Sequence, residues 1–216
     1  MPTQQIIDRI RRALSLDQAV FEEVRDDAAF TPFAGALAAA AIVVAGLGAY
    51  LWGVFNDVGD KGEFFVDALI LGSIFAALLW LAWVALSYVI LSQLYREAVA
   101  PDALFRIAAV GAVPFALGLL VFIPGIGFGI GLLSIALMFF LNVFGLRAAF
   151  PAIDPLRVVL AVSAGFAVWV LILPLLSSPE NPFSPGVFVF EWTEDVVEDF
   201  LDITSAVTDV FGDLGE

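Results

Sequence analysis

Cysteine and histidine are absent from this chain of 216 residues. Without cysteine the chain forms no disulfide, has no thiol nucleophile and gives no information about its redox compartment. Without histidine it has no imidazole for acid–base catalysis, and zinc or haem sites built from cysteine and histidine are excluded. The sequence therefore predicts a protein that is not an enzyme and that has no cofactor or metal site.

Charged residues are missing from four long stretches, which cover residues 28–56, 68–95, 107–146 and 158–179. The chain as a whole is 62% apolar, which is more than a soluble domain usually contains. A transmembrane helix needs about 20 apolar residues, so three of these stretches fit one crossing each. The third would form a helix about 60 Å long at about 1.5 Å per residue, so it must fold back on itself.

The middle of that third stretch contains Pro124 and Gly125, followed by Gly127 and Gly131. Proline cannot continue a helix and glycine reaches the positive-φ conformations of a tight turn, so we expect the chain to reverse here. Gly127 and Gly131 form a GxxxG pair, which is typical of a close helix contact. The sequence thus predicts an all-α, multi-pass protein of the cell membrane with five transmembrane helices over 32–55, 67–95, 103–123, 127–147 and 156–177.

The basic residues predict the orientation of these helices. If the spans alternate, eight of the nine basic residues fall on one side, and the positive-inside rule makes that side cytoplasmic. The N-terminus is then cytoplasmic and the C-terminus exoplasmic. The excess of carboxylates lies almost wholly in the exoplasmic segments, which excludes a nucleic-acid partner on the sign of the charge. A single lysine beside 23 acidic residues suggests a salt-adapted, halophilic prokaryote.

Residues 1–31 are expected to form a cytoplasmic or interfacial amphipathic segment of one or two short helices. Ile6, Ile10 and Leu14 recur at helical spacing among arginines. Ser15 and Gln18 have the spacing of a capping box, with Ser15 as the N-cap of the second helix. Two interpretations stay open: a helix that lies on the membrane lipid, or a cap packed against the ends of the spans.

Residues 178–216 form an acidic exoplasmic tail in which we predict an amphipathic helix over about 194–211. Apolar residues recur in it at spacings of three and four, with carboxylates on the other faces. This stripe either folds back over the chain's own exoplasmic loops or binds a protein partner or a second copy of the chain. Its members are Val196, Phe200, Ile203, Val207, Val210 and Leu214.

Three features of the predicted bundle concern its interior. The first span is rich in alanine and glycine, so we expect it to be a central helix of the bundle. Pro114, near the middle of the third span, predicts a kink, or else the broken helix of a transporter's substrate site. Asn142 in the fourth span is expected to make an interhelical hydrogen bond rather than a ligand contact.

The sequence resembles the Yip1-domain membrane proteins, notably their prokaryotic members, over residues 14–176. The resemblance rests on LSLDQAVFEEVRDD (14–27) before the first span, on LFRIAAVGAVPFALGLL (104–120), and on Phe144-Gly145-Leu146-Arg147 at the end of the fourth span. It implies a five-helix polytopic bundle. The DLYGP-type motif of the eukaryotic members, which are linked to vesicle trafficking and small GTPases, is absent here, so no residue for GTPase binding is implied.

Together these features favour a non-enzymatic, Yip1-like integral membrane protein that organises or scaffolds a membrane assembly. Its partners would be membrane lipid and a protein partner or second copy, bound through small-residue helix faces and the exoplasmic helix. The alternative is a small transporter or channel-like protein for an uncharged or apolar solute, based on Pro114 and the glycine-rich third and fourth spans.

Overall fold

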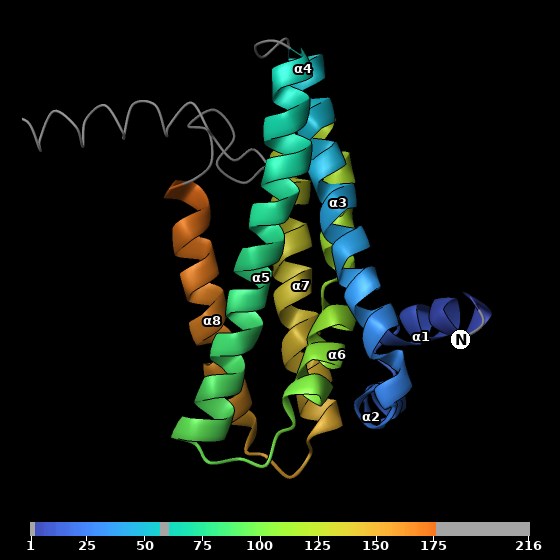
Figure 1. The fold of residues 1–216 in the computed structure, drawn as a ribbon, viewed down its shortest axis with the longest axis vertical. Coiled ribbons are helices and arrows are strands. Elements are labelled where there is room, and N and C mark those ends of the chain that lie inside the picture. The colour runs from blue at the N-terminus through green and yellow to red at the C-terminus, as the bar shows by residue number, and fades with distance from the viewer. Residues whose placement is uncertain (1–2, 57–60, 176–216) are drawn as a thin grey trace, which may run out of the picture.

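The computed structural model describes residues 3–56 and 61–175, and these residues form helices and connecting segments with no strand among them (Figure 1). Five helical stretches are long and apolar enough to cross a membrane: Ala28–Phe55, Phe65–Leu94, Pro101–Phe122, Gly127–Ala149 and Pro155–Ile172. The all-α class and the number of spans are therefore confirmed. The observed limits lie within a few residues of those predicted, because charged residues and prolines mark the ends of apolar helices in sequence as well as in space.

Two short helices precede the first span. Helix α1 covers Thr3–Leu14 and α2 covers Gln18–Asp26. A single 3₁₀ turn, η1 (Ala28–Phe30), then leads into α3 (Thr31–Phe55), which is the first span. Helix α1 lies across the direction of the spans and projects from the side of the bundle beside the start of α3 (Figure 1).

The short helix α4 (Lys61–Phe64) leads into the second span. The span itself is built from three consecutive helical segments: the π-helical segment η2 (Phe65–Leu71), α5 (Gly72–Val89) and the π-helical segment η3 (Ile90–Leu94). The third span consists of α6 (Pro101–Gly111) and the 3₁₀ helix η4 (Val113–Phe122). The fourth and fifth spans are α7 (Gly127–Ala149) and α8 (Pro155–Leu175).

The third span, not the first, is the most enclosed. In its most apolar 18-residue stretch 67% of the residues are buried, against 44% in the first span. The first span, which was predicted to be a central helix, has the same buried fraction as the fourth span, 44%. Both helices contain small residues. In α6, the buried Ala103, Ala108 and Ala109 let neighbouring helices approach from several sides, whereas α3 keeps one face exposed.

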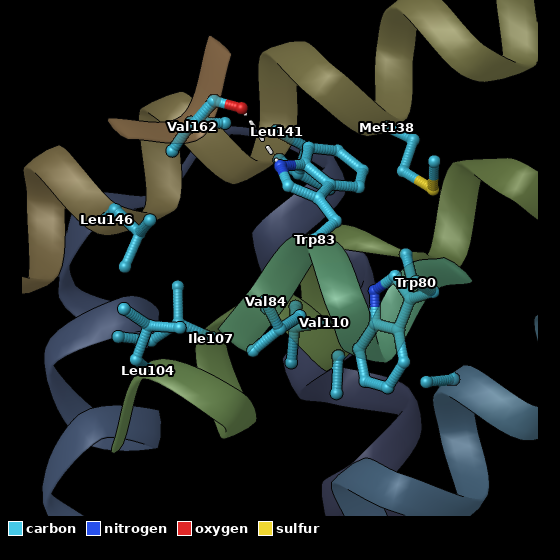
Figure 2. Packing of buried hydrophobic residues seen from close by; sticks show 14 of the residues in the cluster. Trp80, Trp83, Val84, Leu104, Ile107, Val110, Met138, Leu141, Leu146 and Val162 are labelled. Atoms are coloured by element: carbon cyan, nitrogen blue, oxygen red, sulfur yellow. Dashed lines mark hydrogen bonds between the residues drawn. The ribbon is translucent and has the colours of Figure 1, made fainter. Parts of the chain in front are cut away.

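The core between the spans is filled by aromatic and aliphatic side chains (Figure 2). The indole Nε1 of Trp83 in α5 donates a hydrogen bond of 2.9 Å to the carbonyl oxygen of Val162 in α8, and Gly165 leaves room for the Trp83 ring. Ser87, one turn further along α5, donates to the Ala161 carbonyl at 3.3 Å. These bonds stabilise the α5–α8 pair where both partners are buried.

The segments that contain Arg25, Arg96 and Arg157 lie at the same end of the helix bundle. Helix α2, the link between η3 and α6, and the link between α7 and α8 meet there (Figure 1). We call this the arginine-rich end. Lys61, at the start of α4, lies at the opposite end.

Candidate functional site

Arg106 of α6 is the centre of a polar network at the arginine-rich end. The residue is only 2% exposed. Its Nε donates to the carbonyl oxygen of Val24 at 2.9 Å, and its two terminal nitrogens donate to the carbonyl of Arg25, to Thr31 Oγ1 at 3.0 Å and to Asp102 Oδ2 at 2.7 Å. One guanidinium thus joins the end of α2, the start of α3 and the first turn of α6.

This buried charge is compensated by its partners. The carbonyls of Val24 and Arg25 belong to the last turn of α2, where the helix dipole is negative and carbonyls lack intrahelical donors. Asp102 supplies a carboxylate one turn before Arg106 on the same helix. A planar guanidinium can contact all of these acceptors at once, whereas a lysine ammonium cannot.

Arg25 makes the reciprocal connection from α2 to the fourth span. Its guanidinium donates to the carbonyl oxygen of Ala149, the last residue of α7, and lies 6.0 Å from the ring centre of Phe150. It also pairs with Asp26 at 2.7 Å. The hydrogen bond with Asp26 raises the pKa of Arg25 and lowers the pKa of the Asp26 carboxyl. Each of two arginines therefore binds the C-terminal carbonyls of a neighbouring helix.

Apolar contacts fix α2 in the same place. Val20, Phe21 and Val24 have no exposed surface. Phe21 lies against Gly145 of α7, where a Cβ atom would sit 2.6 Å from Phe21 Cε1, and its ring meets that of Phe144 edge-on at 5.8 Å. Helix α2 is thus a cap packed against the ends of the spans, which is one of the two interpretations that the sequence left open.

The junction between α1 and α2 differs from the prediction. Ser15 does not cap α2; its hydroxyl donates to the Arg11 carbonyl, and Asp17 is the N-cap, accepting from the Ala19 amide at 3.0 Å. The reason is that α1 ends in a Schellman turn, in which the Leu16 amide bonds to the Ala13 carbonyl and the Asp17 amide to the Arg12 carbonyl. Ser15 therefore belongs to the end of α1, and Leu16, which follows it, takes the left-handed conformation with a φ of 60°.

Three ion pairs, made by two arginines, hold α1 against its neighbours. Arg9 pairs with Asp27 at 2.8 Å and lies over the ring of Phe30 at 4.8 Å. Arg12 pairs with Asp17 and with Glu23, each at 2.8 Å. The hydrogen bonds to Glu23 and Asp17 raise the pKa of Arg12, and the bond from Arg12 lowers the pKa of the Asp17 carboxyl. The start of the chain is therefore connected to both α2 and the first span.

Within the membrane-spanning part, Asn142 is buried but does not make the expected bond between helices. Its amide nitrogen donates to the Met138 carbonyl of its own helix at 2.8 Å. The interhelical contact is one of packing: a Cβ atom on Gly111 of α6 would lie 2.6 Å from Asn142 Nδ2. Gly111 therefore lets the Asn142 amide lie directly against the α6 backbone.

Pro114 is buried and changes the type of the third helix rather than only bending it. Helix α6 ends at Gly111, and a 3₁₀ helix runs from Val113 to Phe122. Proline has no amide donor and its ring obstructs the carbonyl four residues earlier, so α-helical bonding stops. The next amide, that of Phe115, bonds instead to the Ala112 carbonyl at 2.9 Å, in the i→i+3 pattern. The disturbance that Pro114 predicted is thus a change from α-helical to 3₁₀ hydrogen bonding.

The predicted reversal at Pro124 and Gly125 is confirmed. Gly125 has a φ of +81°, and the Gly127 amide bonds to the Ile123 carbonyl at 3.0 Å to begin α7. Gly127 makes a close contact, because a Cβ there would lie 2.0 Å from the Val121 carbonyl oxygen. Gly131 is buried and its carbonyl accepts from Ser134 Oγ at 2.8 Å.

The glycines of the first span are used inside the chain. A Cβ on Gly48 would lie 2.0 Å from the Gly118 carbonyl oxygen, and one on Gly46 would lie 2.3 Å from Ser73 Oγ. Gly53 receives the ring of Phe64 in the same way. The small-residue face that remains exposed on α3 consists of alanines with two larger residues: Ala36, Ala39, Ala40, Val43 and Leu47.

Two open grooves lie on α1. One is lined by Ile7, Ile10, Arg11, Leu14 and Ser15, and the other by polar residues from α1 together with Glu23. Over residues 3–56 and 61–175 no group of three or more carboxylates could hold a metal ion. The predicted partner-binding residues Val196, Phe200, Ile203, Val207, Val210 and Leu214 lie outside the described residues.

The sequence analysis missed the structural role of Arg106. It used this residue only as one of the basic residues that predict the orientation of the spans. The sequence did contain one signal: Asp102 lies four residues before Arg106, which is the spacing of an ion pair within one helix. Its contacts to Val24, Arg25 and Thr31, 75 to 82 residues away, could not be read from spacing.

Comparisons with models of protein families, with characterised proteins and with solved structures give no match to this chain.

Proposed function

We propose that this chain is a non-enzymatic, Yip1-like protein of the cell membrane that organises a membrane assembly. The observation that carries the proposal is the way α2 is fixed at the arginine-rich end. Arg106 and Arg25 bind the terminal carbonyls of α2 and α7, and Phe21 is enclosed against Gly145. So many contacts on a short helix outside the spans favour a rigid surface presented to one side of the membrane.

The interior of the bundle supports the same proposal. Asn142 is satisfied within its own helix and packed against Gly111, and Trp83 and Ser87 are bonded to helix carbonyls. Such contacts hold helices together and leave no polar path along the described spans at these positions. A role that depends on surfaces is therefore favoured over one that depends on a pore.

The proposed orientation places the arginine-rich end in the cytoplasm and the acidic tail outside. It is supported by the positive-inside rule together with the common location of α2 and the two arginine-bearing links (Figure 1). Because the chain has no native cysteine, single cysteines at Gln18 and Ser205 can be labelled with a membrane-impermeant maleimide. We expect Ser205→Cys to react on intact cells and Gln18→Cys to react only after permeabilisation.

The organising role is tested by native mass spectrometry and crosslinking after mild detergent extraction. We expect a stable complex with a partner or a second copy, which is weakened when Val196, Phe200 and Ile203 are all changed to Ser. A matched control replaces Thr204, Ser205 and Thr208, which lie off the stripe, with Ala. A monomer that binds nothing, with unchanged stability in the triple variant, would refute the proposal.

One observation favours the alternative of a small transporter or channel-like protein for an uncharged or apolar solute. The break at Pro114 is followed by Phe115, whose ring lies 5.9 Å from that of Trp169. The buried indole Nε1 of Trp169 has no hydrogen-bond partner among the residues described. Flux of small apolar or neutral solutes into proteoliposomes, abolished by Trp169→Phe, would support this alternative; flux equal to that of empty liposomes would not.

A further inference from the structure

The apolar side of α1 is only half covered by the protein. Ala13 is buried and Ile6 packs against the core, so one edge of the apolar arc faces α2 and the bundle. The other edge is open, with Ile7 60% exposed and Leu14 52% exposed. Ile10 lies between the two edges and lines the same groove as Ile7 and Leu14. The open edge is therefore a continuous apolar strip along the helix.

The contacts of α1 place it level with the beginning of the first span. Arg9 pairs with Asp27 and lies over Phe30, the residue immediately before α3. The candidate span itself begins at Ala28. Helix α1 also runs across the direction of the spans (Figure 1). A helix at this height and in this direction lies along the boundary between the acyl chains and the headgroups of a bilayer.

The charge next to the open strip is positive and has no ion pair within the described residues. Arg11 is exposed and lines the apolar groove with Ile7 and Leu14. The arginines on either side of it in sequence, Arg9 and Arg12, are both paired with carboxylates that also lie on α2 or at its ends. Arg11 is thus available to an anion from outside the protein.

We infer that α1 docks on the bilayer that the chain itself spans, with Ile7 and Leu14 in the headgroup boundary and Arg11 on the phosphate of an anionic phospholipid. A long arginine side chain at the edge of an apolar strip can bury its stem and keep its charge at the headgroups. Charge complementarity selects an anionic leaflet over a neutral one. The inference requires only that the five apolar spans cross a bilayer, and it does not depend on the organising role proposed above.

The first test measures depth. Single cysteines at Ile7, Leu14 and Gln5 of the full chain carry a nitroxide spin label, with the protein in nanodiscs of phosphatidylcholine and phosphatidylglycerol. Gln5 is the matched control, because it lies on the polar side of the same helix and lines the other groove. We expect the labels at 7 and 14 to collide more with oxygen than with a water-soluble nickel chelate, and the label at 5 to show the reverse. Equal, water-like accessibility at all three positions would overturn the inference.

The second test measures charge. In nanodiscs with phosphatidylglycerol, Arg11→Gln is expected to lower the docked-to-free ratio of α1 about fivefold, and phosphatidylcholine alone to do the same to the unchanged chain. Arg96→Gln, at an exposed arginine outside α1, is the control and should have no effect. If the label at Ile7 is instead buried only in discs that hold two copies, with spin–spin broadening, a second copy covers α1 and the lipid assignment is wrong.

Discussion

The Nε of Arg106 donates a 2.9 Å hydrogen bond to the carbonyl oxygen of Val24, which lies 82 residues earlier in the chain. This bond connects the start of the most buried span to the end of a helix that lies outside the membrane-spanning part. It makes α2 a structural part of the bundle, although α2 has only nine residues. A helix this short is marginal on its own, so its stability must come from such tertiary contacts.

Replacing Arg106 with Gln should destabilise the protein by about 3 kcal/mol, because the buried acceptors on α2 would lose their charged donor. Arg106→Lys should recover only part of this loss, since an ammonium cannot reach the acceptors on α2 and Asp102 together. The measurement is thermal unfolding in detergent, combined with limited proteolysis of residues 1–31. Arg147→Gln is the control, because Arg147 is exposed at the end of α7. Equal stability of the two variants would contradict this role for Arg106.

Gly48→Ala should destabilise the contact between the first and third spans by about 3 kcal/mol. The new Cβ would meet the Gly118 carbonyl oxygen at 2.0 Å, and backbone cannot move aside as a flexible side chain can. Gly129→Ala offers a matched comparison in α7, because a Cβ there meets nothing within 4 Å. That control should be neutral, or stabilising by up to about 1 kcal/mol, since alanine favours a helix over glycine. Unfolding of both variants in the same detergent decides the matter.

Gly125→Ala should cost about 1 to 2 kcal/mol, because φ at this position is +81° and L-residues disfavour that conformation. There is open space around the position, so the loss would come from backbone conformation alone. Gly125→Asn should be milder, since asparagine tolerates the left-handed region better than alanine. Chemical unfolding of the two variants gives the order, and an alanine variant as stable as the asparagine variant would show that the turn relaxes.

Leu16→Gly should stabilise the end of α1 by about 1 kcal/mol. Leu16 has a φ of 60° at the position of the Schellman turn that glycine normally occupies. The stabilisation should appear as slower hydrogen exchange at the Asp17 amide, which bonds to the Arg12 carbonyl. Leu14→Gly, two residues earlier and inside the helix, should speed exchange instead.

Acidification should loosen the α1–α2 junction. The hydrogen bond from Arg12 lowers the pKa of the Asp17 carboxyl below its ordinary value of 3.8. Because the folded-state pKa is the lower one, the stabilising contribution is fully present above about pH 4 and is lost as the pH falls through the folded-state pKa. A ¹³C titration of the Asp17 carboxyl in detergent should show this depression, and Arg12→Gln should return the pKa towards 3.8. An unshifted titration in the unchanged chain would contradict the ion pair.

Sequence alone determined the number of spans and the place of the hairpin. Both depend on the cost of placing charge and unbonded backbone in an apolar environment, and that cost is a property of local composition. The 40-residue stretch had to reverse, and Pro124 with Gly125 was the one point in it where reversal was inexpensive. Pro114 likewise predicted a disturbance in the third span. The sequence did not predict that 3₁₀ bonding would continue as far as Phe122.

The tertiary structure decided which polar groups meet. Asp17 is the cap of α2 in place of the predicted Ser15, because Arg12 binds Asp17 while the Ser15 hydroxyl donates to the Arg11 carbonyl at the end of α1. The Asn142 amide donates to the Met138 carbonyl of its own helix, and Gly111 brings the α6 backbone against that amide. Arg106 acquired its role only when folding brought Val24, Arg25 and Thr31 to it. Partners separated by many residues in sequence are set by packing, and packing depends on the shapes of all the helices at once.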